Sequence, residues 1–168
     1  CSSDLGLAHY KSFTISNYDL MMELIDYCRS HTIDEIQELP HVKERVERYF
    51  QQESKHRTQI QTYGKIFDNL CMVDLKRADE IYAGNRFTVY ALFPQCNISV
   101  HVLWGQKKKN TVFAIGKSIF NRTSNTDVGA LCLEYGGGGH QAAGTCQVEN
   151  ERAYDVKQEL IKRITSDG

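Results

Sequence analysis

The sequence lacks the features that would tie it to a membrane or to a strongly charged partner. No stretch of its 168 residues approaches the roughly 18 consecutive apolar residues of a membrane span. Its formal net charge is −1, so a global positive field for nucleic acid is absent and any phosphate binding has to be local. No basic and apolar signal opens the sequence. These absences predict a cytoplasmic protein without membrane contact.

The six cysteines are far apart, and no C-x-x-C pair occurs among them. This spacing argues against zinc knuckles and redox motifs. Most of the cysteines lie in apolar runs, as buried free thiols do, and they agree with a reducing compartment. The six histidines are equally scattered, and none has a partner three or four residues away that would suggest a metal-binding helix. We therefore expect no metal site in this chain.

The pattern of the sequence changes near residues 55 to 64. Before this point, apolar residues recur at helical spacing. After it, short runs rich in β-branched and aromatic residues alternate with helical patterns. We expect residues 1–60 to form a helical connector and residues 61–168 to form a separate domain. The predicted fold class is α/β, with a mixed β-sheet flanked by helices and preceded by the all-helical connector.

The same patterns give approximate limits for each element. Asn17 and Thr32 are predicted helix caps, and Pro40 is expected to end one helix and open the next. Residues 105–110 are expected to join two strands as a hairpin turn. Helices are predicted over residues 18–29, 32–38, 41–61, 127–135 and 150–165. Strands are predicted over residues 66–75, 87–93, 98–104, 111–119 and 143–148.

Four consecutive glycines, Gly136, Gly137, Gly138 and Gly139, precede His140. Ordering such a run costs backbone entropy, so it indicates a need for positive φ or for close approach of the backbone. Successive N–H groups without neighbouring β-carbons can converge on an anion such as phosphate, and the imidazole can add a further donor. A flexible glycine turn is the plainer alternative.

A second polar segment follows the predicted strand 111–119. Arg122 is suited to hold a phosphate through two parallel hydrogen bonds, and Ser118 and Thr123 can add hydroxyl donors. Lys117 can contribute positive charge. Taken alone, Arg122 also fits an ordinary surface position in a turn.

Other polar and aromatic residues have simpler explanations. The three lysines at residues 107–109 could attract phosphate, but a charged hairpin tip is expected to be solvated. Trp104 and Phe93 could stack on a base, but core or edge positions of strands are favoured for both. Asp127 is expected to cap the helix that follows it.

Residues 121–123, 127–129 and 134–144 read Asn-Arg-Thr, Asp-Val-Gly and Glu-Tyr-Gly-Gly-Gly-Gly-His-Gln-Ala-Ala-Gly. Together they closely resemble the signature of the DHH-associated domain, the C-terminal domain of DHH superfamily phosphoesterases. That superfamily includes exonucleases, oligoribonucleases, cyclic dinucleotide phosphodiesterases and exopolyphosphatase-related proteins. The resemblance is firm over residues 85–149. One turn departs from it, since many members have Arg-Ser where this chain has Asn-Arg-Thr.

The resemblance implies that substrate binding and hydrolysis are divided between two domains. In the family, an N-terminal domain holds two metal ions, usually manganese, through aspartates and an Asp-His-His motif, and the metals activate water for attack on phosphorus. No Asp-His-His occurs in this chain. The resemblance therefore implies the substrate-binding part of a manganese-dependent phosphoesterase, inactive without its N-terminal domain. Cys1 in place of an initiator methionine agrees with an excised piece.

By the same resemblance, a phosphorylated nucleotide or a short single-stranded oligonucleotide would be the ligand. The substrate class is left open among oligonucleotides, nucleoside bisphosphates, cyclic dinucleotides and polyphosphate. Two other hypotheses stand beside this one: a stand-alone nucleic-acid-binding module, and a dimerisation or interaction domain with a vestigial ligand site. The sequence does not decide whether the protein forms a homodimer. The residues expected to contact phosphate are Gly136, Gly137, Gly138, Gly139, His140, Arg122, Ser118 and Thr123.

Overall fold

The computed structural model describes residues 13–168, and the chain divides into two compact units. The first unit comprises the described residues up to His56 together with Glu80–Gly84. The second comprises Arg57–Asp79 and Asn85–Gly168, and it contains every strand of the described residues. This arrangement confirms the predicted α/β fold class, with a mixed sheet and a helical N-terminal part.

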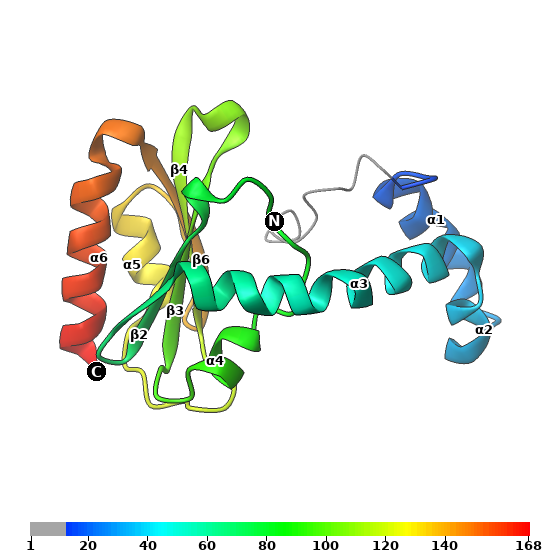
Figure 1. Ribbon diagram of the computed structural model, residues 1–168, viewed down its shortest axis with the longest axis horizontal. Helices are drawn as coiled ribbons and strands as arrows, with labels where there is room; N and C mark the ends of the chain where they lie inside the picture. The colour runs from blue at the N-terminus through cyan, green and yellow to red at the C-terminus, as the bar shows by residue number, and fades with distance from the viewer. Residues whose placement is uncertain (1–12) are drawn as a thin grey trace. The chain divides into compact units, whose positions relative to one another are not determined.

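The first unit is helical (Figure 1). It contains α1 (Asn17–Tyr27), α2 (Ile33–Gln37) and the first part of α3 (Pro40–Tyr63). The cap of α1 is Ser16 rather than Asn17, because the Ser16 side chain accepts a hydrogen bond from the backbone of Asp19 at 3.1 Å. Thr32 caps α2 as predicted, and Glu35 completes a capping box by accepting from the Thr32 backbone N–H at 2.8 Å. This hydrogen bond holds the pKa of Glu35 below its usual value.

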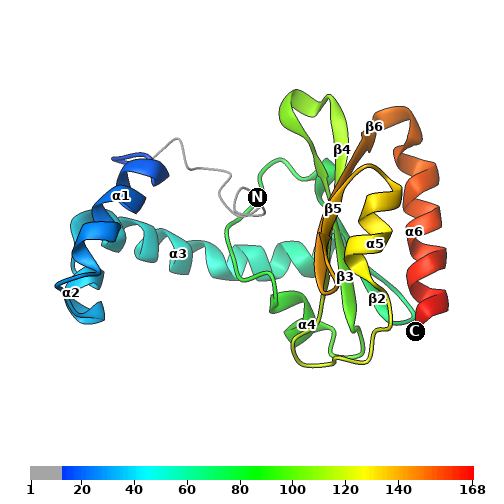
Figure 2. The ribbon, with the colours of Figure 1, turned by 180° about the vertical axis from the view of Figure 1, so that it is seen from behind.

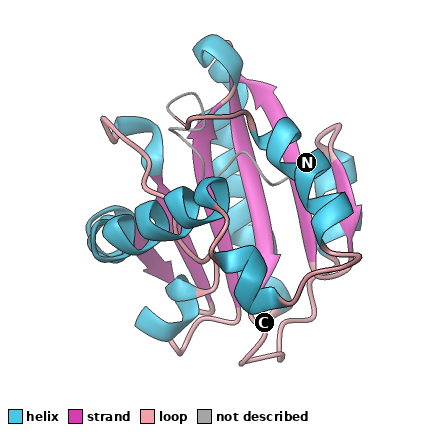
Figure 3. Cartoon of the chain, turned by 90° about the vertical axis from the view of Figure 1, so that its right-hand side faces the viewer, coloured by secondary structure: helices cyan, strands magenta, loops and turns pink. Residues whose placement is uncertain are grey.

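The second unit is built on a six-stranded sheet in the order β1-β2-β3-β4-β6-β5 (Figure 3, magenta). β2 and β3 are parallel, and every other neighbouring pair is antiparallel. Parallel neighbours need a crossover connection, and here the crossover contains α4 (Thr88–Leu92). The strands are β1 Gly64–Phe67, β2 Leu70–Asp74, β3 Ile98–Trp104, β4 Asn110–Lys117, β5 Gly138–His140 and β6 Ala143–Glu149.

Two helices, α5 (Val128–Glu134) and α6 (Ala153–Asp167), cover one face of this sheet (Figures 1 and 2). The buried residues of α6 recur every three or four positions, as expected for a helix that faces a core on one side. Full burial of each large apolar side chain stabilises the fold by about 1.5–3 kcal/mol. The core between helices and sheet includes Val128, Leu131, Val156, Leu160, Ile164, Val100, Phe113 and Cys146.

The hairpin β3–β4 and helices α5 and α6 confirm their predictions to within a few residues. The turn between β3 and β4 is closed by a hydrogen bond of 2.8 Å from the Gly105 N–H to the Asn110 carbonyl. The prediction of one strand over residues 66–75 is wrong, because the chain reverses at Asp68 and forms the hairpin β1–β2. Asp68 takes a φ of 49°, a left-handed conformation that Asp and Asn tolerate better than other side chains.

The prediction of a strand over residues 87–93 is also wrong, since this run forms α4. Aromatic and β-branched residues favour strands only where packing agrees. Here Tyr90 is buried, and its hydroxyl lies 2.5 Å from the carbonyl of Gly116, to which it donates, and 2.8 Å from the hydroxyl of Ser99. The expected loop at residues 136–140 is only partly a loop, because Gly138–His140 pairs with β6 as edge strand β5.

Candidate phosphate-binding site

The segment after β4 is a tightly bonded turn. Ser118 is buried, and its hydroxyl oxygen accepts hydrogen bonds from the backbone N–H groups of Phe120 and Asn121 at 3.1 and 3.0 Å. Its backbone N–H donates to the carbonyl of Asn97 at 2.8 Å. The Ser118 side chain therefore organises the turn from inside, and only its hydroxyl hydrogen is left over for a further bond.

Arg122 is the exposed cation of this turn. Its Nε donates to the carbonyl of Ile119 at 3.0 Å, which ties the guanidinium to the turn that carries it. Its two terminal NH₂ groups have no acceptor among the described residues, so they match the paired donors that a phosphate accepts. The Lys117 ammonium, by contrast, already has an acceptor. Its Nζ donates to the carbonyl of Ser124 at 3.1 Å, and this hydrogen bond bridges the loop.

Thr123 is held by two asparagines. Its hydroxyl donates to Asn121 Oδ1 at 2.7 Å and accepts from Asn97 Nδ2 at 2.9 Å. Asn97 is buried, and its own Oδ1 accepts from Asn69 Nδ2 at 2.8 Å. This network supports the turn from the sheet, and Asn97 is a supporting residue that the sequence patterns did not single out.

The glycine run has different requirements at successive positions. Gly136 has a φ of 73°, a backbone conformation that residues other than glycine rarely adopt. A Cβ on Gly137 would lie 2.1 Å from the carbonyl oxygen of Thr145, so no side chain fits there. A Cβ on Gly138 would meet nothing within 4 Å. Gly138 is therefore the glycine in this run that neither a positive φ nor packing within the described residues requires.

His140 ends β5, and its ring is exposed. Its Nδ1 lies 3.2 Å from the backbone N–H of Ala142, which donates to it. In the neutral ring this hydrogen bond leaves the proton on Nε2, which is then an N–H donor. Such a donor suits the oxygen of a bound anion.

Two backbone hydrogen bonds join these separate motifs. The N–H of Lys117, at the end of β4, donates to the carbonyl of Ala142 at 2.8 Å. The N–H of Val128, at the start of α5, donates to the carbonyl of Gln141 at 3.2 Å. The loop between Lys117 and Val128, which carries Arg122, is thus hydrogen-bonded at both ends to the two residues that follow His140, Gln141 and Ala142.

The hairpin lies on a pair of buried thiols. A Cβ on Gly144 would lie 2.9 Å from the sulfur of Cys132, and Gly137 lies against Cys146. The hydrogen bond with Cys132 and burial raise the pKa of the Cys146 thiol. These cysteines act as close packing beneath the glycine strand, in agreement with the prediction of buried free thiols, which also holds for Cys71 and Cys96.

The remaining predicted features have structural roles. Asp127 caps α5 by accepting from the Ala130 N–H at 3.0 Å. Trp104 donates from Nε1 to the carbonyl of Lys76 at 2.7 Å, and the Lys76 ammonium lies 4.6 Å from the centre of its ring. The lysines at 107–109 are exposed at the hairpin tip, as expected. Phe93 follows α4 and is half-buried.

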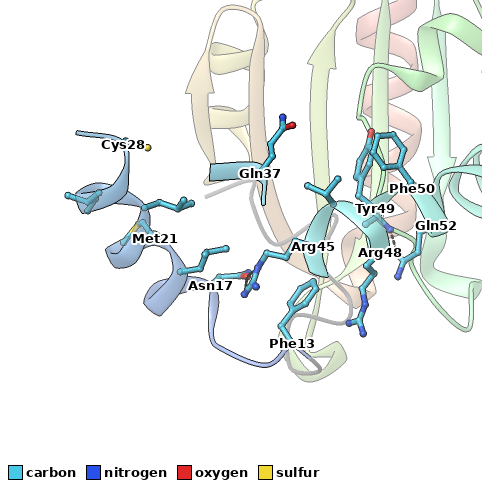
Figure 4. A pocket seen from close by; sticks show the side chains of 15 residues that line it. Phe13, Asn17, Met21, Cys28, Gln37, Arg45, Arg48, Tyr49, Phe50 and Gln52 are labelled. Atoms are coloured by element: carbon cyan, nitrogen blue, oxygen red, sulfur yellow. Dashed lines mark hydrogen bonds between the residues drawn. The ribbon is translucent and has the colours of Figure 1, made fainter. Parts of the chain in front are cut away.

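The helical unit contains a separate hollow of about 1050 Å³ (Figure 4). Met21 of α1 and Phe50 of α3 line it and are 50% and 64% exposed. At one end, the Arg45 guanidinium stacks on the ring of Phe13 at 4.3 Å and donates to the carbonyl of Ile15 at 2.8 Å. Apart from these groups the lining is predominantly apolar, which is typical of a surface that another apolar surface covers.

Among residues 13–168, no three His, Cys, Asp or Glu side chains gather in a cluster that could hold a metal ion. None of the helices in the same range combines the length and the apolar character that a bilayer crossing requires.

Comparison with known proteins gives matches among solved structures. No protein-family model and no curated protein sequence matches the chain. A pGpG-specific phosphodiesterase from Vibrio cholerae is 58% identical, with a TM-score of 0.80; the match covers 93% of this chain and 53% of that one. An exopolyphosphatase-related protein from Bacteroides fragilis has a TM-score of 0.51 at 15% identity, covering 87% of this chain and 42% of that one. At that identity the second likeness concerns the fold alone.

The fold, the glycine–histidine edge and the 58% identity to the Vibrio phosphodiesterase support a DHH-associated domain, whose signature residues 121–144 resemble. The chain spans about half the length of the Vibrio phosphodiesterase, 53% of that chain.

Proposed function

We propose that this chain is the substrate-binding part of a phosphoesterase that acts on short 5′-phosphorylated oligonucleotides, with a linear guanine dinucleotide such as pGpG as the preferred ligand. Arg122 and His140 would hold a phosphate, and the backbone at Gly138 would approach it closely. Ser118 and Thr123 would act mainly by shaping the turn that presents Arg122.

The observation that carries this proposal is the pair of hydrogen bonds from Lys117 to Ala142 and from Val128 to Gln141. They fasten both ends of the loop that carries Arg122 to the residues that follow His140, although Arg122 and His140 are 18 positions apart in sequence. Arg provides a forked donor that matches phosphate oxygens, and the neutral histidine adds a single donor. The net charge of −1 makes this local arrangement, rather than a general field, the source of anion affinity.

The choice of a dinucleotide rests on the Vibrio phosphodiesterase, which is described as specific for pGpG and is 58% identical to this chain over the matched region. A stand-alone nucleic-acid-binding module is the second candidate. The near-neutral composition favours the first, because unspecific nucleic-acid binding depends on many phosphate contacts.

Hydrolysis would require the part of a longer protein that corresponds to the remaining length of the Vibrio enzyme. The described residues offer no donor set for manganese, so we assign no hydrolytic step to them. We propose that the same missing part covers the apolar hollow around Met21 and Phe50. A hollow with this lining, in a chain spanning about half of its relative, fits an interface within one protein.

The test is a calorimetric titration of pGpG into the unsubstituted chain and into Arg122→Ala, His140→Ala and Gly138→Ala variants. We expect binding by the unsubstituted chain and a loss of about 10-fold or more in Arg122→Ala and His140→Ala, since a charge-assisted hydrogen bond contributes about 1.5–3 kcal/mol. Gly138→Ala should also weaken binding, because the added methyl group would keep the phosphate away from the backbone. Lys109→Ala, at the hairpin tip, is the matched control for the loss of a surface cation. Unchanged affinity in the first three variants would contradict the proposed site.

A length series separates the two candidate functions. A substrate site for short ligands should bind pGpG at least as tightly as longer guanine oligonucleotides, with a shallow dependence on salt. A nucleic-acid-binding module should show affinity that rises with length and falls steeply as salt is added.

A further inference from the structure

The turn that carries Arg122 also carries an exposed aromatic ring. Phe120 is 69% exposed, and its neighbour Ile119 is 45% exposed. Exposing a phenyl ring forgoes about 1.5–3 kcal/mol of burial free energy, and single exposed apolar residues are common enough on their own to need no explanation. What distinguishes Phe120 is the rigidity and the position of the turn that presents it.

The turn holds Phe120 outward through its own hydrogen bonds. The backbone N–H of Phe120 is fixed to the hydroxyl of buried Ser118 at 3.1 Å, and the next N–H is fixed to the same oxygen. On the other side, Arg122 Nε closes the turn onto the Ile119 carbonyl at 3.0 Å. These bonds fix the backbone on both sides of Phe120, and the side chain that this backbone carries is exposed rather than buried.

We infer that Phe120 is a stacking platform for a nucleobase of the ligand whose phosphate Arg122 and His140 hold. The inference rests on the proposed function and extends it by giving the site a base contact. Phe120 and Arg122 are two positions apart, so their Cα atoms lie at most about 7.6 Å from each other. The phosphate and the base of one nucleotide are joined through a single ribose, and one short turn can therefore contact both. An aromatic ring stacks on any base, and guanine offers a large π-surface to it.

The chain provides a matched control for this ring. Tyr154 of α6 is 71% exposed, belongs to the same unit and lies outside the Ser118–Arg122 turn. Phe120→Ala and Tyr154→Ala thus remove an exposed aromatic ring of nearly equal exposure. Phe120→Trp keeps a stacking surface and serves as the rescue variant.

The experiment compares two ligands by calorimetry, pGpG and the base-free ribose 5-phosphate, with a 5′-phosphorylated 2-aminopurine dinucleotide as a fluorescent probe of stacking. We expect Phe120→Ala to weaken pGpG binding by about 10-fold or more, within the range measured for base–aromatic stacking, and to change ribose 5-phosphate binding less than about twofold. Phe120→Trp should retain pGpG affinity and quench the 2-aminopurine at least as strongly as the unsubstituted chain. Tyr154→Ala should change neither ligand.

Failure of this inference differs from failure of the proposed function. If Phe120→Ala binds pGpG like the unsubstituted chain while Arg122→Ala and His140→Ala lose it, the stacking platform is overturned and the phosphate site stands. An equal loss of pGpG and ribose 5-phosphate in Phe120→Ala would also overturn it, because the ring would then support the turn rather than the base. No pGpG binding by the unsubstituted chain would overturn the proposed function, and the stacking platform with it.

Discussion

The backbone N–H of Lys117 donates a 2.8 Å hydrogen bond to the carbonyl of Ala142, and this bond joins the end of β4 to the residue two positions after His140. It continues the β4–β6 ladder, in which Gly116 is already paired with Ala143. The sheet thereby joins one end of the loop that carries Arg122 to the hairpin that carries His140. A ligand that contacts both residues would meet donors that need little reorganisation, which reduces the entropic cost of binding.

The glycine run predicts a sharp difference between two alanine substitutions. Gly137→Ala should destabilise the fold by about 1–3 kcal/mol, because the new Cβ would overlap the Thr145 carbonyl and the backbone would have to shift. Gly138→Ala should leave the free energy of unfolding within about 0.5 kcal/mol, since open space surrounds that position. Urea denaturation of both variants measures the difference.

Ligand binding completes this comparison. A folded Gly138→Ala chain that no longer binds pGpG would indicate that the phosphate approaches the backbone at this glycine. Equal stability of the two variants would contradict the steric account of Gly137.

Asn97 should be needed for both stability and affinity. Asn97→Ala leaves Thr123 and Asn69 without a buried partner, so we expect a loss of about 1–3 kcal/mol in the free energy of unfolding. Because the Arg122 turn loses its support from the sheet, pGpG affinity should fall as well. Asn125→Ala is the control, since Asn125 is exposed in the same loop and its side chain donates to the Asp167 carbonyl at 3.1 Å. Similar unfolding curves for the two variants would argue against a supporting role for Asn97.

The sequence predicted those parts of the fold that depend on local patterns. The alternating run at residues 98–104 became β3 with the same limits, and the capped segment after Asp127 became α5. The β-branched and aromatic residues at 87–93 predicted a strand, but they form α4. Tyr90 of this helix is hydrogen-bonded to the neighbouring strands, and such tertiary packing overrides strand propensity. Such non-local packing leaves no trace in periodicity.

The same limit applies to the candidate site. The residue types at Arg122 and His140 indicated phosphate binding, and the glycines indicated close backbone approach. The hydrogen bonds that join the segments carrying these residues run between backbone atoms of Lys117, Gln141, Ala142 and Val128. Backbone groups are the same in every residue, so no sequence pattern marks these contacts. The exposure of Phe120 likewise follows from the geometry of the Ser118 turn.

Cysteine reactivity should follow burial. Burial raises the pKa of Cys71 to about 12, and only thiolates react readily with alkylating agents. With iodoacetamide at pH 8, Cys28 should be modified quickly, because it is exposed, whereas Cys71, Cys96, Cys132 and Cys146 should react only on unfolding. Peptide mapping by mass spectrometry distinguishes the sites. Rapid modification of Cys71 in the folded chain would contradict its burial.

The raised pKa of Cys71 also predicts a pH dependence of stability. In the unfolded chain its thiol titrates near about 8.5, so between that pH and about 12 the folded state retains a proton that the unfolded state has lost. The contribution of Cys71 is therefore fully present below pH 8.5 and decreases as the pH rises through this window. The free energy of unfolding should fall less between pH 8 and pH 10.5 in Cys71→Ala than in the unsubstituted chain, and equal slopes would count against the assignment.

The reactivity of Cys28 can report whether the apolar hollow of the helical unit is covered. Cys28 lines this hollow beside Met21, and it is exposed in the chain described here. If the remaining part of a longer protein packs on the hollow, the iodoacetamide reaction of Cys28 should slow by about 10-fold or more in that protein relative to this chain, because access then requires local opening.

Phe50→Asp should restore fast labelling of Cys28 in the longer protein, since an unpaired carboxylate in an apolar interface is costly. Ile33→Asp is the matched control, because Ile33 is 74% exposed on α2 and does not line the hollow. Equal labelling rates in the chain and in the longer protein would show that the hollow stays open to solvent, and a surface of this size and apolar character would then be available to a separate partner chain.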